Sequence, residues 1–154
     1  MIEIERKYLI KNLDFLGSVQ GSKIVQGYLS KDPERAVRVR ISGNSAFLTI
    51  KGKSSNSGLS RYEWETEITV EEAQDLLKIC LSGVIDKTRY ELAHEGQTWV
   101  IDIFHRENLG LILAEIELSS EGQEFSTPKW VDKEVTGDPR YYNSYLSSNP
   151  FTTW

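Results

Sequence analysis

The stretch Glu3-Ile4-Glu5-Arg6-Lys7, close to the beginning of the chain, decides the fold. Successive side chains of a β-strand point to opposite faces of the sheet, so a strand here places both glutamates and the lysine on one face. The other face carries Ile4 with Ile2 and Tyr8, which can pack against apolar side chains. The two carboxylates lie about 7 Å apart along such a strand, so they can share one metal ion only with help from another strand. We therefore expect a β-sheet protein whose strands bring charged faces together.

The composition limits the class of protein. The chain has 154 residues, and we expect a single domain over residues 1–154 with a substantial core. Its one cysteine cannot form an internal disulfide, and the sequence shows neither a secretory signal nor an apolar run of ~20 residues. These features predict a cytoplasmic protein with no membrane partner. The net charge of -5 argues against binding a nucleic acid polymer, which favours a basic surface.

Alternation of apolar and polar residues predicts seven further strands, mostly joined by hairpins. Thr69, followed three residues later by Glu72, forms a capping box and predicts a helix that runs to about residue 81. Pro128 and the pair Asp138-Pro139 are typical of two more helix starts, so the tail is expected to pack on or plug the end of the sheet. The further strands are expected at residues 24–30, 36–41, 46–53, 61–68, 85–93, 98–104 and 111–118.

The charged faces of these strands are sorted by sign. Three strands pair basic residues at positions i and i+2 and three pair acids, namely Arg38/Arg40, Lys51/Lys53, Lys87/Arg89, Glu3/Glu5, Glu63/Glu65 and Glu115/Glu117. Like charges on one face of a sheet repel each other, so solubility alone does not explain this arrangement. Clustered cations with clustered acids suit a ligand that carries many negative charges and binds together with a divalent metal ion.

Two architectures are compatible with this alternation. In an open sheet the apolar face packs on the core and the charged face meets water. Eight strands can also close into a barrel, and the charged faces can then line a water-filled tunnel, although so many ions could not line a dry core. The apolar outer faces would need covering, and Tyr62, Trp64 and Trp99 are candidates for those contacts. We favour the closed form: an α+β protein with an eight-stranded antiparallel barrel, a charged interior and a few flanking helices.

Taken together, the motifs resemble the CYTH superfamily of triphosphate tunnel metalloenzymes. The opening stretch matches the ExExK signature of that superfamily, and the later motifs follow in its order over nearly the whole chain. The tail is similar to the short bacterial branch. The motifs are Arg38-Val39-Arg40, Thr49-Ile50-Lys51-Gly52, Arg61 with Glu63 and Glu65, Lys87-Thr88-Arg89-Tyr90, Asp102, Ala114-Glu115-Ile116-Glu117, and in the tail Glu134-Val135-Thr136-Gly137-Asp138 with Tyr141-Tyr142-Asn143.

This resemblance implies an eight-stranded antiparallel tunnel in which acids hold one or two Mg²⁺ or Mn²⁺ ions and basic residues hold a triphosphate. The implied metal ligands are Glu3, Glu5, Glu115 and Glu117. The implied phosphate-binding residues are Lys7, Tyr28, Arg38, Arg40, Lys51, Arg61, Lys87 and Arg89, whereas Lys53 and Lys133 have no firm place in the pattern. Glu63, Glu65 and Asp102 are implied to bind a second metal ion or to orient water, and Lys87 joins them as a catalytic candidate.

The chemistry of these residue types agrees with those roles. Carboxylate oxygens suit Mg²⁺ or Mn²⁺, and Arg and Lys suit phosphate oxygens. Because a metal ion can lower the pKa of water, no Ser or Cys nucleophile is required, and Cys80 is better explained as part of the apolar stripe of a helix. We therefore hypothesise hydrolysis of a terminal phosphoryl group by metal-activated water. For the short bacterial branch, the preferred substrate is inorganic tripolyphosphate, which yields pyrophosphate and phosphate.

Several alternatives stay open on the sequence alone. Nucleoside triphosphates such as ATP or thiamine triphosphate could replace tripolyphosphate, and an adenylate cyclase would need a base-binding pocket that the sequence does not identify. A non-catalytic polyphosphate or nucleotide-binding module would need cations more than acids. A carrier of the lipocalin type would need an apolar lumen, and the absence of a GxxxxGKS loop excludes a P-loop NTPase. The oligomeric state is not determined, and a homodimer is one option.

Overall fold

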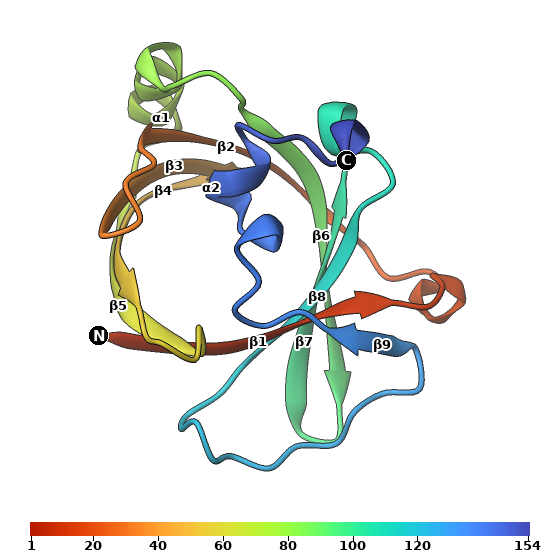
Figure 1. Cartoon of the computed structure of the whole chain (residues 1–154). Helices are drawn as coiled ribbons and strands as arrows, with labels where there is room; N and C mark the ends of the chain where they lie inside the picture. Colours follow the sequence, from red (N-terminus) through yellow and green to blue (C-terminus); the bar gives the residue numbers. More distant parts are fainter.

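The computed structural model describes residues 1–154 and shows a closed antiparallel β-barrel. The eight barrel strands follow the order β5-β4-β3-β2-β6-β7-β8-β1, and pairing of β1 with β5 closes the ring (Figure 1). The expected fold class is therefore confirmed. The strands are β1 (Ile2–Ile10), β2 (Ser22–Ser30), β3 (Arg35–Ser42), β4 (Ser45–Ser54), β5 (Ser60–Ile68), β6 (Ile85–His94), β7 (Gln97–Phe104) and β8 (Ile112–Glu117).

Strand β1 carries the closure of the barrel. One of its edges pairs with β8 over Glu5 to Leu9, while the first part of its other edge pairs with β5 over Ile2 to Ile4. Beyond Ile4, a ninth strand, β9 (Val131–Glu134), replaces β5 beside the end of β1. The backbone N–H of Val135 then donates to the carbonyl of Lys7 at 2.8 Å. The C-terminal tail therefore completes the seam that β5 leaves open.

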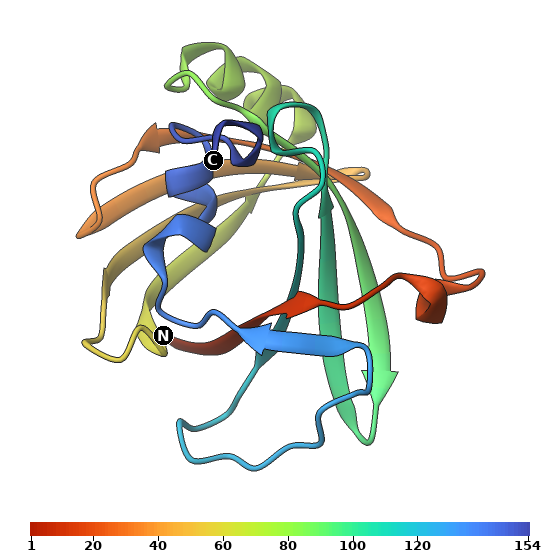
Figure 2. The same ribbon diagram turned by 45° about the vertical axis from the view of Figure 1, so that its right-hand side comes forward.

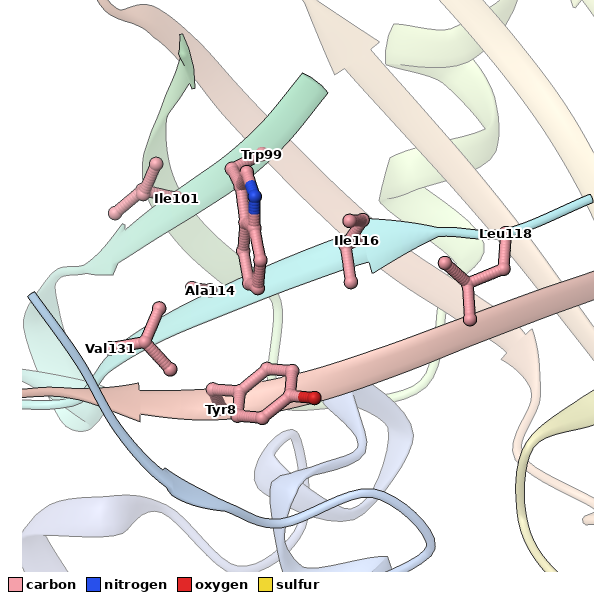
Figure 3. Close-up of a cluster of buried hydrophobic side chains, with 7 residues drawn as sticks. All are labelled: Tyr8, Trp99, Ile101, Ala114, Ile116, Leu118 and Val131. Carbon is pink, nitrogen blue, oxygen red and sulfur yellow. The ribbon is translucent and has the colours of Figure 1, made fainter. Parts of the chain in front are cut away.

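The outer face of β1, β7 and β8 forms the largest buried apolar cluster (Figure 3). Trp99 is fully buried at its centre, and its ring contacts the rings of Tyr8, Phe125 and Trp130. Phe125 and Trp130 come from the long connection between β8 and β9, so this loop covers the apolar face. The expectation that Trp99 needs a covering contact is confirmed.

A second covering element is helix α1 (Val70–Ile79), which lies over β2, β3 and β4 (Figure 2). Its capping box is formed as expected: the Glu72 N–H donates to Thr69 Oγ1 at 3.1 Å, and the Thr69 N–H donates to Glu72 Oε2 at 2.8 Å. Gly27 permits the close approach, because a Cβ there would lie 2.9 Å from Cys80 Sγ. Cys80 thus packs against the barrel, as expected for a residue on the apolar stripe.

The inner face is charged in its middle but apolar at one end. Ile85, Phe104 and Leu113 share the inner faces of their strands with the charged residues, and they pack against Val135 and Leu146 of the tail. In Figure 1, the segment that contains α2 (Asn143–Leu146) lies within the ring of strands. The tail therefore plugs this end of the barrel, and the expectation of a charged interior holds only for the remaining length.

The tail differs from the sequence expectation in one element. No helix starts at Pro128, because the chain turns there and enters β9, whose backbone pairs with β1. The start at Asp138-Pro139 is correct: the Asp138 carboxylate accepts the N–H of Arg140, a 3₁₀ helix follows over Pro139–Tyr141, and α2 comes next. Tertiary pairing with β1 has overridden the local signal at Pro128. The other 3₁₀ helices are Asp14–Leu16, Arg106–Asn108 and Phe151–Thr153.

One part of the outer face has no covering element. Tyr62 is 49% exposed and Trp64 is 45% exposed on β5, and their strand neighbours Ile2 and Ile50 are also exposed. The expectation that Tyr62 and Trp64 make covering contacts is therefore wrong within this chain. Separately, the structure contains no helix that is both long and apolar enough to cross a bilayer.

Docking of the tail predicts a large effect of truncating Leu146. This side chain is fully buried in the apolar plug, so we expect Leu146→Ala to lower the free energy of unfolding by about 2–5 kcal/mol. Urea unfolding followed by tryptophan fluorescence measures the change. The control is Thr153→Ala, an exposed site in the same tail that should stay within about 0.5 kcal/mol of the parent protein. Equal effects of the two substitutions would contradict the plug.

Candidate active site

The charged part of the barrel interior encloses a cavity of about 230 Å³. Of the 18 residues that line it, 3 are hydrophobic, which excludes a carrier with an apolar lumen. The basic and polar strand residues of the lining are Lys7, Tyr28, Arg38, Arg40, Lys51, Arg61, Lys87 and Arg89, and the acidic residues are Glu3, Glu5, Glu63, Glu65, Glu115 and Glu117. All the site residues expected from the sequence therefore converge here, except Asp102.

Strand registry explains this convergence. Residues that face each other across neighbouring strands share one face, and the register pairs Arg38 with Thr49, Lys51 with Glu63, and Lys7 with Glu115. The ladder thus carries the period of two from one strand to the next around the ring. Closure then turns the charged residues of this face inward.

Lysines separate the carboxylates in this cavity. Lys51 Nζ lies 2.6 Å from Glu3 Oε2 and 2.9 Å from Glu63 Oε2, and Lys7 Nζ lies 3.0 Å from Glu115 Oε1. Burial alone would lower the pKa of Lys7, but the Glu115 and Glu5 carboxylates outweigh it and raise that pKa above its usual range. Lys7 therefore stays charged at neutral pH.

Glu65 is bound by three groups from neighbouring strands. It accepts a hydrogen bond from Thr49 Oγ1 at 2.6 Å and lies 3.5 Å from the guanidinium groups of Arg38 and Arg40. Burial, and then the neighbouring positive charges of Arg38 and Arg89, lower the pKa of Arg40 to about 10. The two arginines thus repel each other, and an anion placed between them would relieve that repulsion.

Asp102 lies behind the cavity wall and holds two cations in place. Its carboxylate is 1% exposed and accepts Lys87 Nζ at 2.7 Å and two guanidinium N–H groups of Arg89, each at 2.8 Å. Burial, together with the nearby charge of Arg89, lowers the pKa of Lys87 to about 8 against the opposing effect of Asp102. Because Arg89 shares the carboxylate, Asp102 does not compensate fully for the burial of Lys87.

Glu5 and Glu117 form the least compensated part of the site. They are direct register partners across β1 and β8, and like charges in that position are destabilising. The nearest cation to Glu5 is Lys7 at 4.0 Å, and Glu117 has no ion pair within 4.0 Å. Burial and Glu115 raise the pKa of Glu5, while burial followed by Glu3, Glu63 and Glu5 raises that of Glu117. The cluster therefore carries negative charge that the side chains around it do not balance.

A divalent metal ion fits this cluster in one specific way. No three side chains among Glu, Asp, His and Cys lie close enough together to hold a metal ion by themselves. Mg²⁺, however, is usually bound by one or two carboxylates together with substrate phosphates and waters. Glu5 and Glu117 offer carboxylate oxygens with surplus negative charge, so they suit that mode, whereas Glu115 is already engaged with Lys7.

The sequence assigned no role to three lining residues from the tail. Tyr142, Asn143 and Ser144 enter the barrel between β9 and the apolar plug and form part of the cavity wall. The ring of Tyr142 lies 5.7 Å from Lys7 Nζ and 5.8 Å from the Arg61 guanidinium carbon. The run Tyr141-Tyr142-Asn143 was the only signal in the sequence, and its position inside a barrel depends on tertiary contacts.

The fold and the cavity together define a class of protein: a closed antiparallel β-barrel whose internal tunnel is suited to a compact polyanion and a cation. Residues 1–142 match the CYTH domain family. The chain therefore belongs to the CYTH domain family, as the sequence motifs indicated.

Individual relatives support this membership. The chain is 45% identical over 150 residues to a protein of Acetivibrio thermocellus named inorganic triphosphatase, covering 97% of this chain and 95% of the relative. It is 36% identical over 151 residues to a protein of the same name from Nitrosomonas europaea, covering 96% and 97% of the two chains. A crystal structure of the inorganic triphosphatase NE1496 superposes with a TM-score of 0.68 at 32% identity, covering 94% of this chain and 93% of that one.

The charge imbalance at Glu5 predicts opposite effects on stability and on metal binding. The raised pKa of Glu5 means that, above its ordinary pKa, the ionised group is less favourable in the folded than in the unfolded chain. We therefore expect Glu5→Gln to raise the urea midpoint at pH 7 in the presence of a chelator. Binding of Mn²⁺, followed by electron paramagnetic resonance with pyrophosphate present, should weaken by more than the roughly 10- to 100-fold typical of groups that only support the metal ligands.

The control for this prediction is Glu124→Gln, at an exposed position in the loop between β8 and β9. It should change neither quantity. A Glu5→Gln variant that is less stable than the parent protein without metal would show that no repulsion is present.

Proposed function

We propose that this protein is a metal-dependent inorganic triphosphatase that hydrolyses tripolyphosphate to pyrophosphate and phosphate. The main support is the cavity itself. Seven basic side chains surround a small internal space, and the carboxylates of Glu5 and Glu117 lie beside them without a close counter-ion. Two relatives named inorganic triphosphatase share at least 36% of their residues with this chain over nearly their full lengths. Phosphoryl transfer depends mainly on positioning and charge neutralisation, and this cavity offers both.

The basic residues divide by the geometry that they offer to phosphate. Arg38, Arg40 and Arg61 present guanidinium forks suited to bidentate contacts, whereas Lys7 and Lys51 act as point charges. Tyr28 also lines the cavity, and burial raises the pKa of its hydroxyl, so the hydroxyl remains protonated and can donate to a phosphate oxygen.

Metal and triphosphate are expected to bind together. Without ligands, the acids of the cavity are neutralised by its lysines and arginines. A triphosphate alone would draw the cations away and leave carboxylates facing phosphate oxygens. A metal ion bound to Glu5 and Glu117 removes that penalty, so each ligand should raise the affinity for the other.

The metal ion is expected to be Mg²⁺ or Mn²⁺, held by Glu5 and Glu117 with Glu3 nearby. When bound, it would neutralise phosphate charge and lower the pKa of water. Glu115 was implied as a further ligand, but its contact with Lys7 at 3.0 Å suits it better to positioning that lysine.

Lys87 is the best-placed proton acceptor. Two of the carboxylates expected to orient water are weak bases, because Glu63 is paired with Lys51 and Asp102 with Lys87 and Arg89, and the pKa of each is lowered despite burial. Lys87 lines the cavity, and its pKa of about 8 lies close to the range in which a general base is effective. A water molecule would attack the terminal phosphorus and pass a proton to Lys87 Nζ as the bond to the pyrophosphate oxygen breaks.

A second substrate class is suggested by the mouth of the barrel. A further cavity of about 510 Å³ adjoins the first and shares Ala36, Arg61, Tyr142 and Ser144 with it. Its wall also includes Pro33, Pro139 and Tyr145, whose flat apolar surfaces suit a nucleobase. Nucleoside triphosphates such as ATP are therefore a candidate second substrate, with the phosphates in the tunnel and the nucleoside at the mouth.

The direct test incubates purified protein with tripolyphosphate and ATP in parallel, with Mg²⁺, Mn²⁺ or a chelator. We expect release of phosphate and pyrophosphate from tripolyphosphate with either metal and none with the chelator, with slower turnover of ATP. Assays for phosphate, pyrophosphate and cyclic AMP separate a triphosphatase from a cyclase. The variant Glu117→Gln should lose at least ~100-fold in turnover, a typical loss for one transition-state contact, and still bind tripolyphosphate. A parent protein that binds tripolyphosphate without turning it over would instead be a binding module.

The role of Lys87 predicts a specific pH dependence. Its amine becomes neutral as the pH rises through about 8, so kcat/KM for tripolyphosphate should rise roughly tenfold per pH unit below that value and level off above it. We expect Lys87→Arg to lose this rise and about 10²–10⁴ in kcat, because an arginine stays protonated. The exposed Lys78→Arg on α1 serves as the control. A parent profile that is flat between pH 6 and 9 would exclude Lys87 as the base.

Two expectations from the sequence stay predictions. The single cysteine, which is free, favours a reducing compartment such as the cytoplasm. The exposed apolar side chains of β5 leave a homodimer open.

A further inference from the structure

The C-terminal tail holds Asn143 in a defined place inside the barrel. On the N-terminal side, the Lys7 N–H donates to Thr136 Oγ1 at 2.9 Å, and β9 pairs with β1. On the other side, Leu146 is fully buried in the apolar plug. Gly137, at φ +77°, passes close to Gly58: a Cβ added to Gly58 would lie 2.3 Å from the Cα of Gly137. The segment between these anchors is thus fixed by contacts that involve no ligand.

The Asn143 side chain contacts the amine of Lys87. Its Oδ1 atom accepts hydrogen bonds from Lys87 Nζ and from Gln26 Nε2, each at 3.0 Å. Because both partners are donors, the side-chain oxygen and not the nitrogen must face Lys87. Gln26 therefore sets the orientation of the Asn143 amide.

The environment of Gln26 supports this role. Its side chain is completely buried, and its Oε1 atom has no hydrogen-bond partner. A buried carbonyl without a partner destabilises the folded state, so an apolar residue of similar shape would serve stability better. What the amide does provide is the N–H group that orients Asn143.

The two acceptors around Lys87 determine where its free position points. A neutral amine has two N–H groups and one lone pair, and Asp102 Oδ2 at 2.7 Å and Asn143 Oδ1 at 3.0 Å each take one N–H. Lys87 lines the cavity and has no other hydrogen-bond partner in the protein. The lone pair therefore points away from Asp102 and Asn143, toward the cavity. With Asn143 absent, the amine could rotate about its Cε–Nζ bond and satisfy Asp102 with the lone pair turned away.

We propose that Asn143, carried into the barrel by the C-terminal tail, is a positioning residue that orients the Lys87 amine toward the substrate, with Gln26 holding the Asn143 amide in the required direction. This inference rests on the proposed triphosphatase function, in which Lys87 accepts a proton. The tail is thus part of the reaction site and not only a plug.

Two variants of Asn143 separate orientation from packing. Asn143→Leu keeps the volume and removes the acceptor, and we expect it to lower kcat for tripolyphosphate about 10- to 100-fold with little change in KM. Asn143→Asp keeps an acceptor oxygen and should retain most of kcat at alkaline pH. Asn149→Ala, an exposed asparagine in the same tail, should behave as the parent protein. Urea unfolding of each variant shows whether the tail remains docked.

A double-mutant cycle tests whether Asn143 acts through Lys87. In a Lys87→Met background, Asn143→Leu should cause no further loss of kcat, because the group that it orients is already absent. The pair Gln26→Met and Asn143→Leu should likewise show less than additive losses. Losses that multiply in the Lys87→Met background, or a parent-like kcat of Asn143→Leu, would overturn the proposal.

A measurement without turnover keeps this test separate from that of the function. The ¹³Cε resonance of Lys87, assigned by its disappearance in Lys87→Met, should shift in Asn143→Leu and remain near its parent position in Asn149→Ala. An unchanged Lys87 resonance in Asn143→Leu would contradict the contact itself. If the parent protein does not hydrolyse tripolyphosphate, the proposed function and the proposed role fail, whatever the resonance shows.

Discussion

The closure of the sheet through β1 is the constraint on which the rest of the structure depends. Most strands alternate apolar and charged residues, and an open sheet could leave the charged face in water. Because β1 pairs with β8 on one edge and with β5 on the other, the like-charged residues of most strands face the interior. The apolar faces turn outward instead and are covered by α1 and by the loop that carries Phe125 and Trp130. Closure of the sheet therefore produces both the charged cavity and the outer apolar clusters.

Closure concentrates like charges that would otherwise be dispersed in solvent. The structure tolerates them by pairing across strands, as Lys51 does with two glutamates and Asp102 does with two cations. The pairing is incomplete at Glu5 and Glu117, and the pKa values of both carboxyls are raised for that reason among others. Sites that are prepared for ligands often carry such uncompensated interactions, because the ligand supplies the missing partner. Under the proposed function, a divalent cation bound with a phosphate chain would supply that partner.

The C-terminal tail has three structural roles that follow from its route. It completes the seam beside β1, it fills the apolar end of the barrel, and it places Tyr142 and Asn143 against the cations of the cavity. A single segment therefore joins the stability of the barrel to the geometry of Lys87. That coupling gives the buried amide of Gln26 a role although its oxygen has no hydrogen-bond partner.

The sequence by itself determined the strands and nearly all of the cavity wall, because alternation at a period of two assigns each side chain to a face, and sorting of charge by sign marks the face that binds. It also placed the capping box of α1, a local contact between residues three apart. The tertiary structure decided what depends on distant contacts. Residues 131–134 form a strand because they pair with β1. Asp102 lies behind the cavity wall because it binds Arg89 and Lys87. Asn143 contacts Lys87, 56 positions away in the chain, because the tail enters the barrel. No local pattern encodes such contacts, since their energy exists only once the barrel has closed.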